Sequence, residues 1–201
     1  MALSLSFILR FLYSQLLISV PYPKKDFTGQ TVIVTGSNTG LGLEAARHFS
    51  RLNAERIILA VRNVEKGEVA KKSIEASTNR RGVVEVWQLD LTSYDSVKQF
   101  ARRAEGLNRL DVLLENAGLL TKNFTMAEED ELTITINVVS TFLLGLLLLP
   151  KLHETSAKFN VLPRLVIVTS ELHFVTSFKE RNSPNIFEEL SNKDTANMAD
   201  R

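Results

Sequence analysis

Residues 31–42 have the sequence TVIVTGSNTGLG, and this stretch decides the fold. Its first five residues are β-branched or apolar, which predicts a short buried strand. Gly36, Gly40 and Gly42 follow, and the helical periodicity of residues 41–52 predicts a helix directly after them. In such a turn the first glycine permits a sharp bend, the second lets the backbone approach a pyrophosphate, and the third lets helix and strand pack closely. The stretch therefore predicts a dinucleotide-binding turn with phosphate at a helix N-terminus.

The rest of the chain alternates between strand and helix patterns. Further strands are predicted at residues 56–61, 83–89, 110–114 and 164–169, and helices at 64–76, 93–105 (with Ser93 as N-cap) and 131–153. Continuous apolar strands separated by helices indicate parallel strands that are buried on both faces. Right-handed crossovers then give an α/β, doubly wound parallel sheet, the Rossmann fold. We expect an amphipathic segment and linker at residues 1–25, and the nucleotide-binding domain at 26–201.

Composition excludes several classes of site. Among the 201 residues, 24 are Lys or Arg and 23 are Asp or Glu, so the net charge of +1 offers nothing to neutralise nucleic acid phosphates. The chain has no cysteine, which excludes disulfides, thiolate nucleophiles and cysteine zinc sites. The three histidines are far apart in the sequence, so no metal site is expected.

The first twenty residues are apolar but are interrupted by Arg10 and Gln15. They lack the charged start and small-residue cleavage site of a secretory signal. As a spanning helix the segment is marginal in length and carries an arginine near its middle. Two interpretations stay open: an amphipathic helix that packs on the domain, and a helix that lies on a membrane surface. We expect a cytoplasmic protein, with membrane association through residues 1–20 left open.

Further motifs follow the glycine turn in a fixed order. They are Leu89-Asp90-Leu91, Asn116-Ala117-Gly118 preceded by Glu115, Asn137 within the long helix, and Ser170 after the fifth strand. With T-G-x-x-x-G-x-G, this order over residues 27–170 resembles the short-chain dehydrogenase/reductase family. The motifs TGSNTGLG and LENAG are similar to those of a fungal branch of the family near the retinol-dehydrogenase-like reductases. Glu115 departs from the family, which has asparagine there.

The resemblance implies roles for individual residues. It implies that Ser170 polarises a substrate carbonyl, that Asn137 holds a proton-relay water, and that Asp90 binds the adenine amino group. The expected cofactor-binding residues are Gly36, Ser37, Asn38, Gly40, Leu41, Gly42, Arg62, Asp90, Leu91, Asn116, Ala117 and Gly118. Each has a simpler alternative: Asp90 as a helix cap, Asn137 bonded to a neighbouring carbonyl, and Ser170 as a turn residue.

The end of the second strand predicts which cofactor binds. Chains that bind NAD usually have an acidic residue there, bonded to the ribose 2′-hydroxyl. Here Val61 occupies that position and Arg62 follows it. A guanidinium forms charge-assisted bonds to a 2′-phosphate, so we expect NADP(H). The alternative is a solvated surface arginine.

The resemblance also implies a catalytic tyrosine with a lysine four residues later, after Ser170. Tyr13, Tyr22 and Tyr94 all precede Ser170. Tyr94 has the lysine spacing, but it lies on the helix after the third strand, so we interpret the match as coincidence. Residues 171–201 are expected to be a polar loop. The chain is therefore expected to be truncated before the Y-x-x-x-K motif, with the sheet incomplete on its C-terminal side.

These patterns lead to one expected function and one alternative. The first is an NADP(H)-dependent oxidoreductase for a small-molecule carbonyl or alcohol, in fungal secondary metabolism. The alternative is a catalytically inactive nucleotide-binding fragment that lacks the Tyr/Lys pair. We expect the 201-residue chain alone to be inactive. Its unpaired fifth strand and apolar helix 131–153 favour association, so a homo-oligomer stays open.

Overall fold

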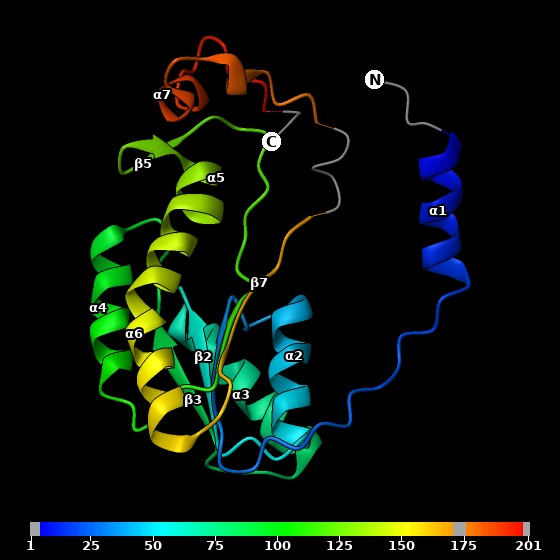
Figure 1. Ribbon diagram of the computed structural model, residues 1–201, viewed down its shortest axis with the longest axis vertical. Coiled ribbons are helices and arrows are strands. Elements are labelled where there is room, and N and C mark those ends of the chain that lie inside the picture. The colour runs from blue at the N-terminus through cyan, green and yellow to red at the C-terminus, as the bar shows by residue number, and fades with distance from the viewer. Residues whose placement is uncertain (1–4, 171–175, 199–201) are drawn as a thin grey trace.

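A five-stranded parallel sheet forms the centre of the protein (Figure 1). The computed structural model describes residues 5–170 and 176–198. The strands are β1 (Thr31–Thr35), β2 (Arg56–Val61), β3 (Val84–Gln88), β4 (Val112–Glu115) and β7 (Arg164–Ile167). Their order is β3-β2-β1-β4-β7, and every neighbouring pair is parallel. The strand order reverses between β1 and β4, so the predicted doubly wound α/β fold is confirmed.

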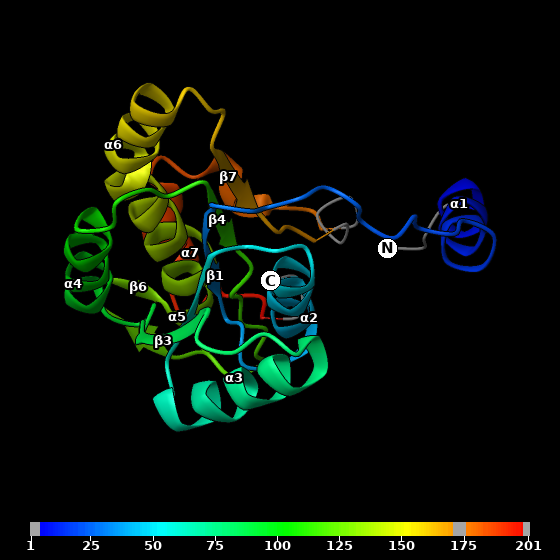
Figure 2. The same ribbon diagram turned by 90° about the horizontal axis from the view of Figure 1, so that it is seen from below.

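Helices cover both faces of this sheet (Figure 2). One layer contains α2 (Gly40–Arg51) and α3 (Val64–Thr78); the other contains α4 (Tyr94–Glu105) and the long α6 (Thr141–Phe159). Alternate residues of β1 point to opposite faces: Val32 and Val34 join the core under α2 and α3, and Ile33 joins the core under α4 and α6. Both faces of β1 are therefore buried, which explains its unbroken apolar sequence.

A buried carboxylate ties the start of β1 to the start of β4. Asp111 Oδ2 accepts a hydrogen bond from the Thr31 amide at 2.9 Å and another from Arg109 Nε at 2.8 Å. The Asp111 side chain is 5% exposed and that of Arg109 is 18% exposed. This ion pair is therefore largely shielded from water and is part of the sheet's framework.

Replacing Asp111 should destabilise the fold. Asp111→Ala leaves a largely buried guanidinium and a backbone N–H without their acceptor, so we expect a loss of about 3 kcal/mol in the free energy of unfolding. Urea denaturation measures it. Asp95→Ala is the control, because the Asp95 side chain is 86% exposed and sits 3.8 Å from Lys98; its loss should stay below about 1 kcal/mol. Equal losses in the two variants would contradict the assignment.

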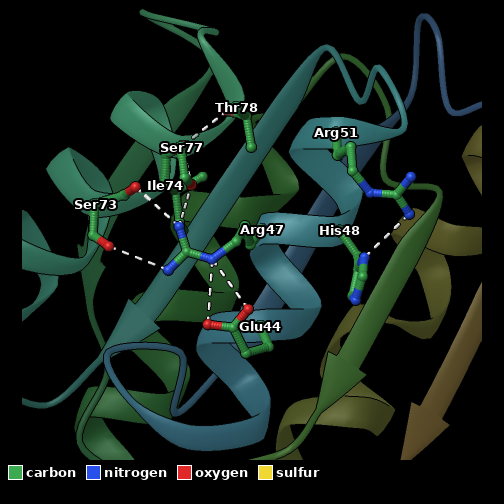
Figure 3. A network of polar contacts seen from close by, with 8 residues as sticks. All are labelled: Glu44, Arg47, His48, Arg51, Ser73, Ile74, Ser77 and Thr78. Atoms are coloured by element: carbon green, nitrogen blue, oxygen red, sulfur yellow. Dashed lines mark hydrogen bonds and ion pairs between the residues drawn. The ribbon is translucent and has the colours of Figure 1, made fainter. Parts of the chain in front are cut away.

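A polar network holds α2 against α3 (Figure 3). The Arg47 guanidinium pairs with Glu44 on its own helix at 3.1 Å and donates to the Ser73 carbonyl at 2.9 Å and the Ser73 hydroxyl at 3.2 Å. It also donates to the Ser77 hydroxyl. These bonds fix the rotation of α2, whose first turn follows the glycine-rich segment.

The long apolar helix differs in detail from the prediction of 131–153. It consists of α5 (Leu132–Ile134), a π-helical stretch over Thr135–Ser140 and α6, so it continues to Phe159. By length and composition alone, this helix is long and apolar enough to cross a membrane. The core helix of a globular domain meets them too, and here Leu144 and Leu148 are fully buried. The helix packs beside α4 on the sheet (Figure 2).

Two short helical turns interrupt the predicted loop after Ser170 where the structure describes it. A 3₁₀ turn covers Lys179–Asn182, and α7 covers Ile186–Leu190. This segment packs on a small hairpin of β5 (Met126–Ala127) and β6 (Asp130–Glu131), where Ser191 Oγ donates to Asp130 at 3.2 Å. Asn185 caps α7 and Leu190 is buried, which explains the order of this polar segment. Residues 171–175 and 199–201 lie outside the described residues.

The N-terminal helix α1 (Leu5–Leu16) stands apart from the domain in both views (Figures 1 and 2). Leu16 is 75% exposed and Leu17 is 73% exposed. The interpretation that this helix packs on the domain is therefore wrong. The linker between Leu17 and Asp26, which contains Pro21 and Pro23, forms neither helix nor strand. It connects α1 to the domain, which lies well away from α1 (Figure 2).

Candidate cofactor and substrate site

The glycine turn closes against the end of β4. Gly36 has a φ of +64°, and a Cβ there would lie 2.9 Å from the Cα of Ala117. A Cβ on Gly42 would lie 2.5 Å from Nδ2 of Asn116 and 2.7 Å from the Gly36 carbonyl oxygen. Both positions exclude a side chain, because the backbones of the turn, α2 and the segment after β4 are in contact.

Hydrogen bonds join the ends of β1 and β4 beside this turn. The Thr35 hydroxyl oxygen accepts from the amides of Asn116 at 3.0 Å and Ala117 at 2.9 Å. Asn116 Nδ2 donates in return to the Thr35 carbonyl at 3.1 Å. The Asn116 side chain thus fixes the two strand ends, at the point where the strand order reverses. Ligands of doubly wound sheets bind in the crevice at this point.

The start of α2 has the features of an anion site. Its N-cap, Thr39, makes no side-chain hydrogen bond to the helix, whereas Asn63 caps α3 and Ser93 caps α4. The first N–H groups of α2 therefore lack a side-chain acceptor. Gly40 has a φ of +58°, and no heavy atom lies within 4 Å of where its Cβ would be. This open space and the free N–H groups fit a pyrophosphate.

A cavity of about 210 Å³ lies in the crevice. Its lining includes seven of the predicted cofactor-binding residues: Gly36, Asn38, Arg62, Asp90, Leu91, Ala117 and Gly118. It also includes residues that the sequence analysis missed: Ala60, Leu89, Thr92, Leu119 and Ile136. Most of these are apolar residues at strand ends or on the long helix. The only feature of the sequence that could have indicated these lining residues is their position beside the motifs.

Five of the predicted cofactor-binding residues do not line this cavity. They are Ser37, Gly40, Leu41, Gly42 and Asn116. Ser37 is fully buried and its hydroxyl donates to the Val34 carbonyl at 2.8 Å, so it stabilises the turn. The remaining four shape the turn and the start of α2.

Two polar side chains reach the cavity from the ends of β2 and β3. Arg62 is exposed and makes no hydrogen bond or ion pair with any residue in 5–170 or 176–198. Asp90 Oδ1 accepts from the amide of Thr92 at 2.9 Å and from its hydroxyl at 2.8 Å. The cap of α4 is Ser93, as predicted, so Asp90 does not have that role.

A second cavity, of about 640 Å³, adjoins the first, and the two share Ala117, Gly118 and Leu119. Both predicted catalytic residues, Asn137 and Ser170, line it. The Asn137 amide is already engaged: it donates to the Leu119 carbonyl and accepts from the Leu119 amide, both at 2.8 Å. The alternative that Asn137 bonds a neighbouring carbonyl therefore describes its side chain. Ser170 is exposed at the end of the β7 segment.

Glu115 is a buried carboxyl group beneath this second cavity. It is 2% exposed, and neither carboxyl oxygen has a hydrogen-bond partner among the described residues. Gly145 of α6 faces it, and a Cβ there would be 3.5 Å from Oε1. Burial raises the pKa of Glu115 to about 8. At neutral pH the group is therefore mostly protonated and uncharged.

Glu115 should make the protein less stable as the pH rises. Below pH 4.5 the group is neutral in both states; above it the unfolded chain ionises while the folded chain stays protonated up to about pH 8. Folding stability should thus fall across this interval, by up to about 4 kcal/mol. Glu115→Gln should match the wild type near pH 5 and exceed it by about 2–4 kcal/mol at pH 8.

Thermal melts at pH 5, 6.5 and 8 check this. Glu105→Gln, which removes an exposed carboxylate from the end of α4, is the matched control and should not change the pH dependence. If wild type and Glu115→Gln showed parallel curves, the carboxyl group would not be buried as described.

Tyr94 has the wrong environment for a catalytic base. Its hydroxyl donates to Asp130 at 3.4 Å, and burial together with the charge of Asp130 raises its pKa above the usual value of 10. An activated tyrosine needs a lowered pKa. Lys98 pairs with Asp95 at 3.8 Å. These contacts support the interpretation that the Tyr94–Lys98 spacing is coincidence.

Comparisons with known proteins agree with this geometry. Residues 30–177 match the family described as short chain dehydrogenase. The chain is 50% identical to short chain dehydrogenase atnD of Emericella nidulans over 98% of its own length and 63% of the relative's. It is 47% identical to short chain dehydrogenase/reductase dmxR8 of Cryptosporiopsis, over 92% of this chain and 59% of that one. The chain thus spans about 60% of the length of these curated relatives.

A solved structure of a putative short chain dehydrogenase from Escherichia coli CFT073, complexed with NADPH, superimposes with a TM-score of 0.60. It is 30% identical and matches 84% of this chain and 68% of its own. The family match, the relatives and the crevice between β1 and β4 agree. The chain belongs to the short-chain dehydrogenase/reductase family of oxidoreductases, which bind a nicotinamide cofactor and act on small molecules.

Proposed function

We propose that the chain is the nucleotide-binding part of an NADP(H)-dependent oxidoreductase that acts on a carbonyl or alcohol. The observation that carries this proposal is that Arg62 lines the crevice cavity and has no polar partner within the described parts of the chain. An acidic residue at the end of β2 would favour the 2′-hydroxyl of NAD, but that position is Val61. The NADPH complex of the Escherichia coli relative is in line with this choice.

Each part of the crevice has a role in this proposal. The first N–H groups of α2, after Gly40, bind the pyrophosphate. Asp90 accepts a hydrogen bond from the adenine amino group, and Arg62 binds the 2′-phosphate. When bound, the nicotinamide supplies or accepts a hydride. Ser170 donates a hydrogen bond to the substrate oxygen, and Asn137 holds the main chain of Leu119 between the two cavities.

Arg62→Ala should separate the two cofactors. Loss of charge-assisted bonds to the 2′-phosphate should weaken NADPH binding by about 1.5–3 kcal/mol, roughly 10- to 150-fold, and leave NADH binding within about two-fold. Fluorescence titration of both cofactors measures this. Lys66→Ala removes the same charge from an exposed position in the first turn of α3 and should change neither affinity. Equal losses for NADPH and NADH in Arg62→Ala would refute the assignment.

The substrate proposal rests on the second cavity. Leu120, Val138 and Phe142 give it an apolar wall beside Ser170. The relatives with matching sequence come from fungi such as Emericella nidulans. We propose a lipophilic carbonyl or alcohol of fungal secondary metabolism as the substrate class. Such a substrate suits a cytoplasmic enzyme that works at a membrane surface.

The chain's division and assembly belong to the same proposal. Residues 1–25 form a separate segment and linker, and residues 26–201 form the nucleotide-binding domain. Phe142 and Leu146 are 55% and 63% exposed on α6, and β7 is an edge strand with Val166 42% exposed. Exposed apolar surface next to an open sheet edge favours association, so we propose a homo-oligomer.

A second candidate function is nucleotide binding without catalysis. It is favoured by the positions of the tyrosines: Tyr13, Tyr22 and Tyr94 do not line the cavity that contains Ser170. The proposal predicts that the 201-residue chain binds NADPH but does not turn over a ketone, because no tyrosine lines the described part of the cavity that contains Ser170.

NADPH fluorescence gives binding, and loss of NADPH absorbance with a generic ketone gives turnover. Gly36→Ala serves as the binding control, since its Cβ would meet the backbone of Ala117 and distort the turn. Robust turnover would contradict the prediction. Absence of NADPH binding would refute both candidate functions.

A further inference from the structure

Helix α1 and the residues after it expose a large apolar surface. Leu9, Leu12 and Leu16 are 59%, 45% and 75% exposed, and Val20 is 84% exposed. No described part of the domain lies beside this helix in either view (Figures 1 and 2). A helix of 12 residues is marginally stable in water without a partner. Its apolar surface therefore has to be covered for the helix to persist.

The charges of the segment indicate what covers it. Residues 5–25 contain Arg10, Lys24 and Lys25 and no acidic residue; the first carboxylate is Asp26. Arg10 and Ser14 are one turn apart and share a face, whereas Leu9, Leu12 and Leu16 have i, i+3, i+7 spacing and lie together on the opposite face. An apolar face opposite Arg10, with two further basic residues after the helix, matches acyl chains beneath anionic headgroups.

The length of the helix decides its orientation. The twelve described residues of the helix extend about 18 Å, which is shorter than the roughly 30 Å of a bilayer's hydrocarbon core. Arg10 lies in the middle of the helix, where an orientation across the bilayer would bury its charge. A helix lying flat keeps Arg10 at the headgroups and the leucines below them.

The linker is clamped to the domain just after this segment. The Arg51 guanidinium lies 4.1 Å from the centre of the Tyr22 ring and donates to the Pro23 carbonyl at 3.2 Å. The Tyr22 ring also meets His48 edge-on, with centroids 4.9 Å apart. Lys24 and Lys25 directly follow this clamp in the sequence. Helix α2 lies on the side of the domain from which the chain extends to α1 (Figure 2).

We infer that α1 lies flat in the interface of an anionic lipid membrane, with its leucines among the acyl chains and Arg10, Lys24 and Lys25 at the headgroups. The inference deepens the proposed membrane-surface location but does not depend on the reductase activity. It assigns a partner to a surface that the nucleotide site does not use.

Vesicle flotation with the full chain tests the inference. We expect binding to vesicles of mixed phosphatidylcholine and phosphatidylserine, and much weaker binding to phosphatidylcholine alone. Leu12→Asp/Leu16→Asp should reduce binding at least about ten-fold, because it places carboxylates in the acyl region. Val69→Asp is the control: Val69 is 69% exposed on α3, so a carboxylate is added away from the membrane and binding should not change.

A second pair of substitutions tests the charge contribution. Lys24→Gln/Lys25→Gln should weaken binding to the anionic vesicles about 25-fold, from about five-fold per basic residue. It should leave binding to phosphatidylcholine unchanged. Circular dichroism establishes that each variant retains the folded domain, so the outcome is independent of the proposed function.

Three outcomes would overturn the inference. One is no binding to either kind of vesicle. Another is equal binding by the wild type and Leu12→Asp/Leu16→Asp. The third is a wild-type dimer in sedimentation that this variant converts to a monomer, without vesicle binding; a second copy of the chain would then be the partner of α1.

Discussion

The close approach of the ends of β1 and β4 determines the site. These strand ends are neighbours in space although Thr35 and Asn116 are 81 residues apart. The Thr35 hydroxyl accepts two backbone N–H groups, and Gly36 is packed so tightly on Ala117 that no side chain fits. Each hydrogen bond contributes about 1 kcal/mol, but their larger effect is geometric. Both cavities share Ala117, so this contact positions the predicted cofactor groove and the predicted substrate cavity together.

The fold could be predicted from local patterns, because strands buried on both faces and separated by helices leave few possible topologies. The site could be predicted only in part. The roles of the glycines could be predicted, since a tight turn or a close backbone contact admits no other residue. The orientation of the Ser37 side chain could not be predicted, because its hydroxyl turns back to Val34 within the turn. Ile136 and Leu119 were missed for another reason: an apolar residue becomes part of a cavity wall only through tertiary packing.

Glu115 shows how a sequence difference acquires its physical meaning from packing. The sequence identifies a glutamate where the resemblance implies asparagine, but it does not say whether the group is charged. Burial between β4 and α6, opposite Gly145, removes water from the carboxyl group and leaves it without a partner. An ionised carboxylate is very unfavourable in such a place, so the group remains neutral instead. A charged residue in the sequence thus becomes a neutral acid beside the cavity that contains Ser170.

Helix α2 connects the two surfaces that the proposals use. Its first turn leaves N–H groups free for phosphate, and near its other end Arg51 and His48 hold the linker at Tyr22. Between these ends, Arg47 fixes it to α3, which begins just after Arg62 (Figure 3). A helix held in this way behaves as a rigid spacer. If α1 lies on a membrane, the clamp at Tyr22 therefore places the last turn of α2, and not its phosphate-binding first turn, next to the linker that leads to the lipid surface.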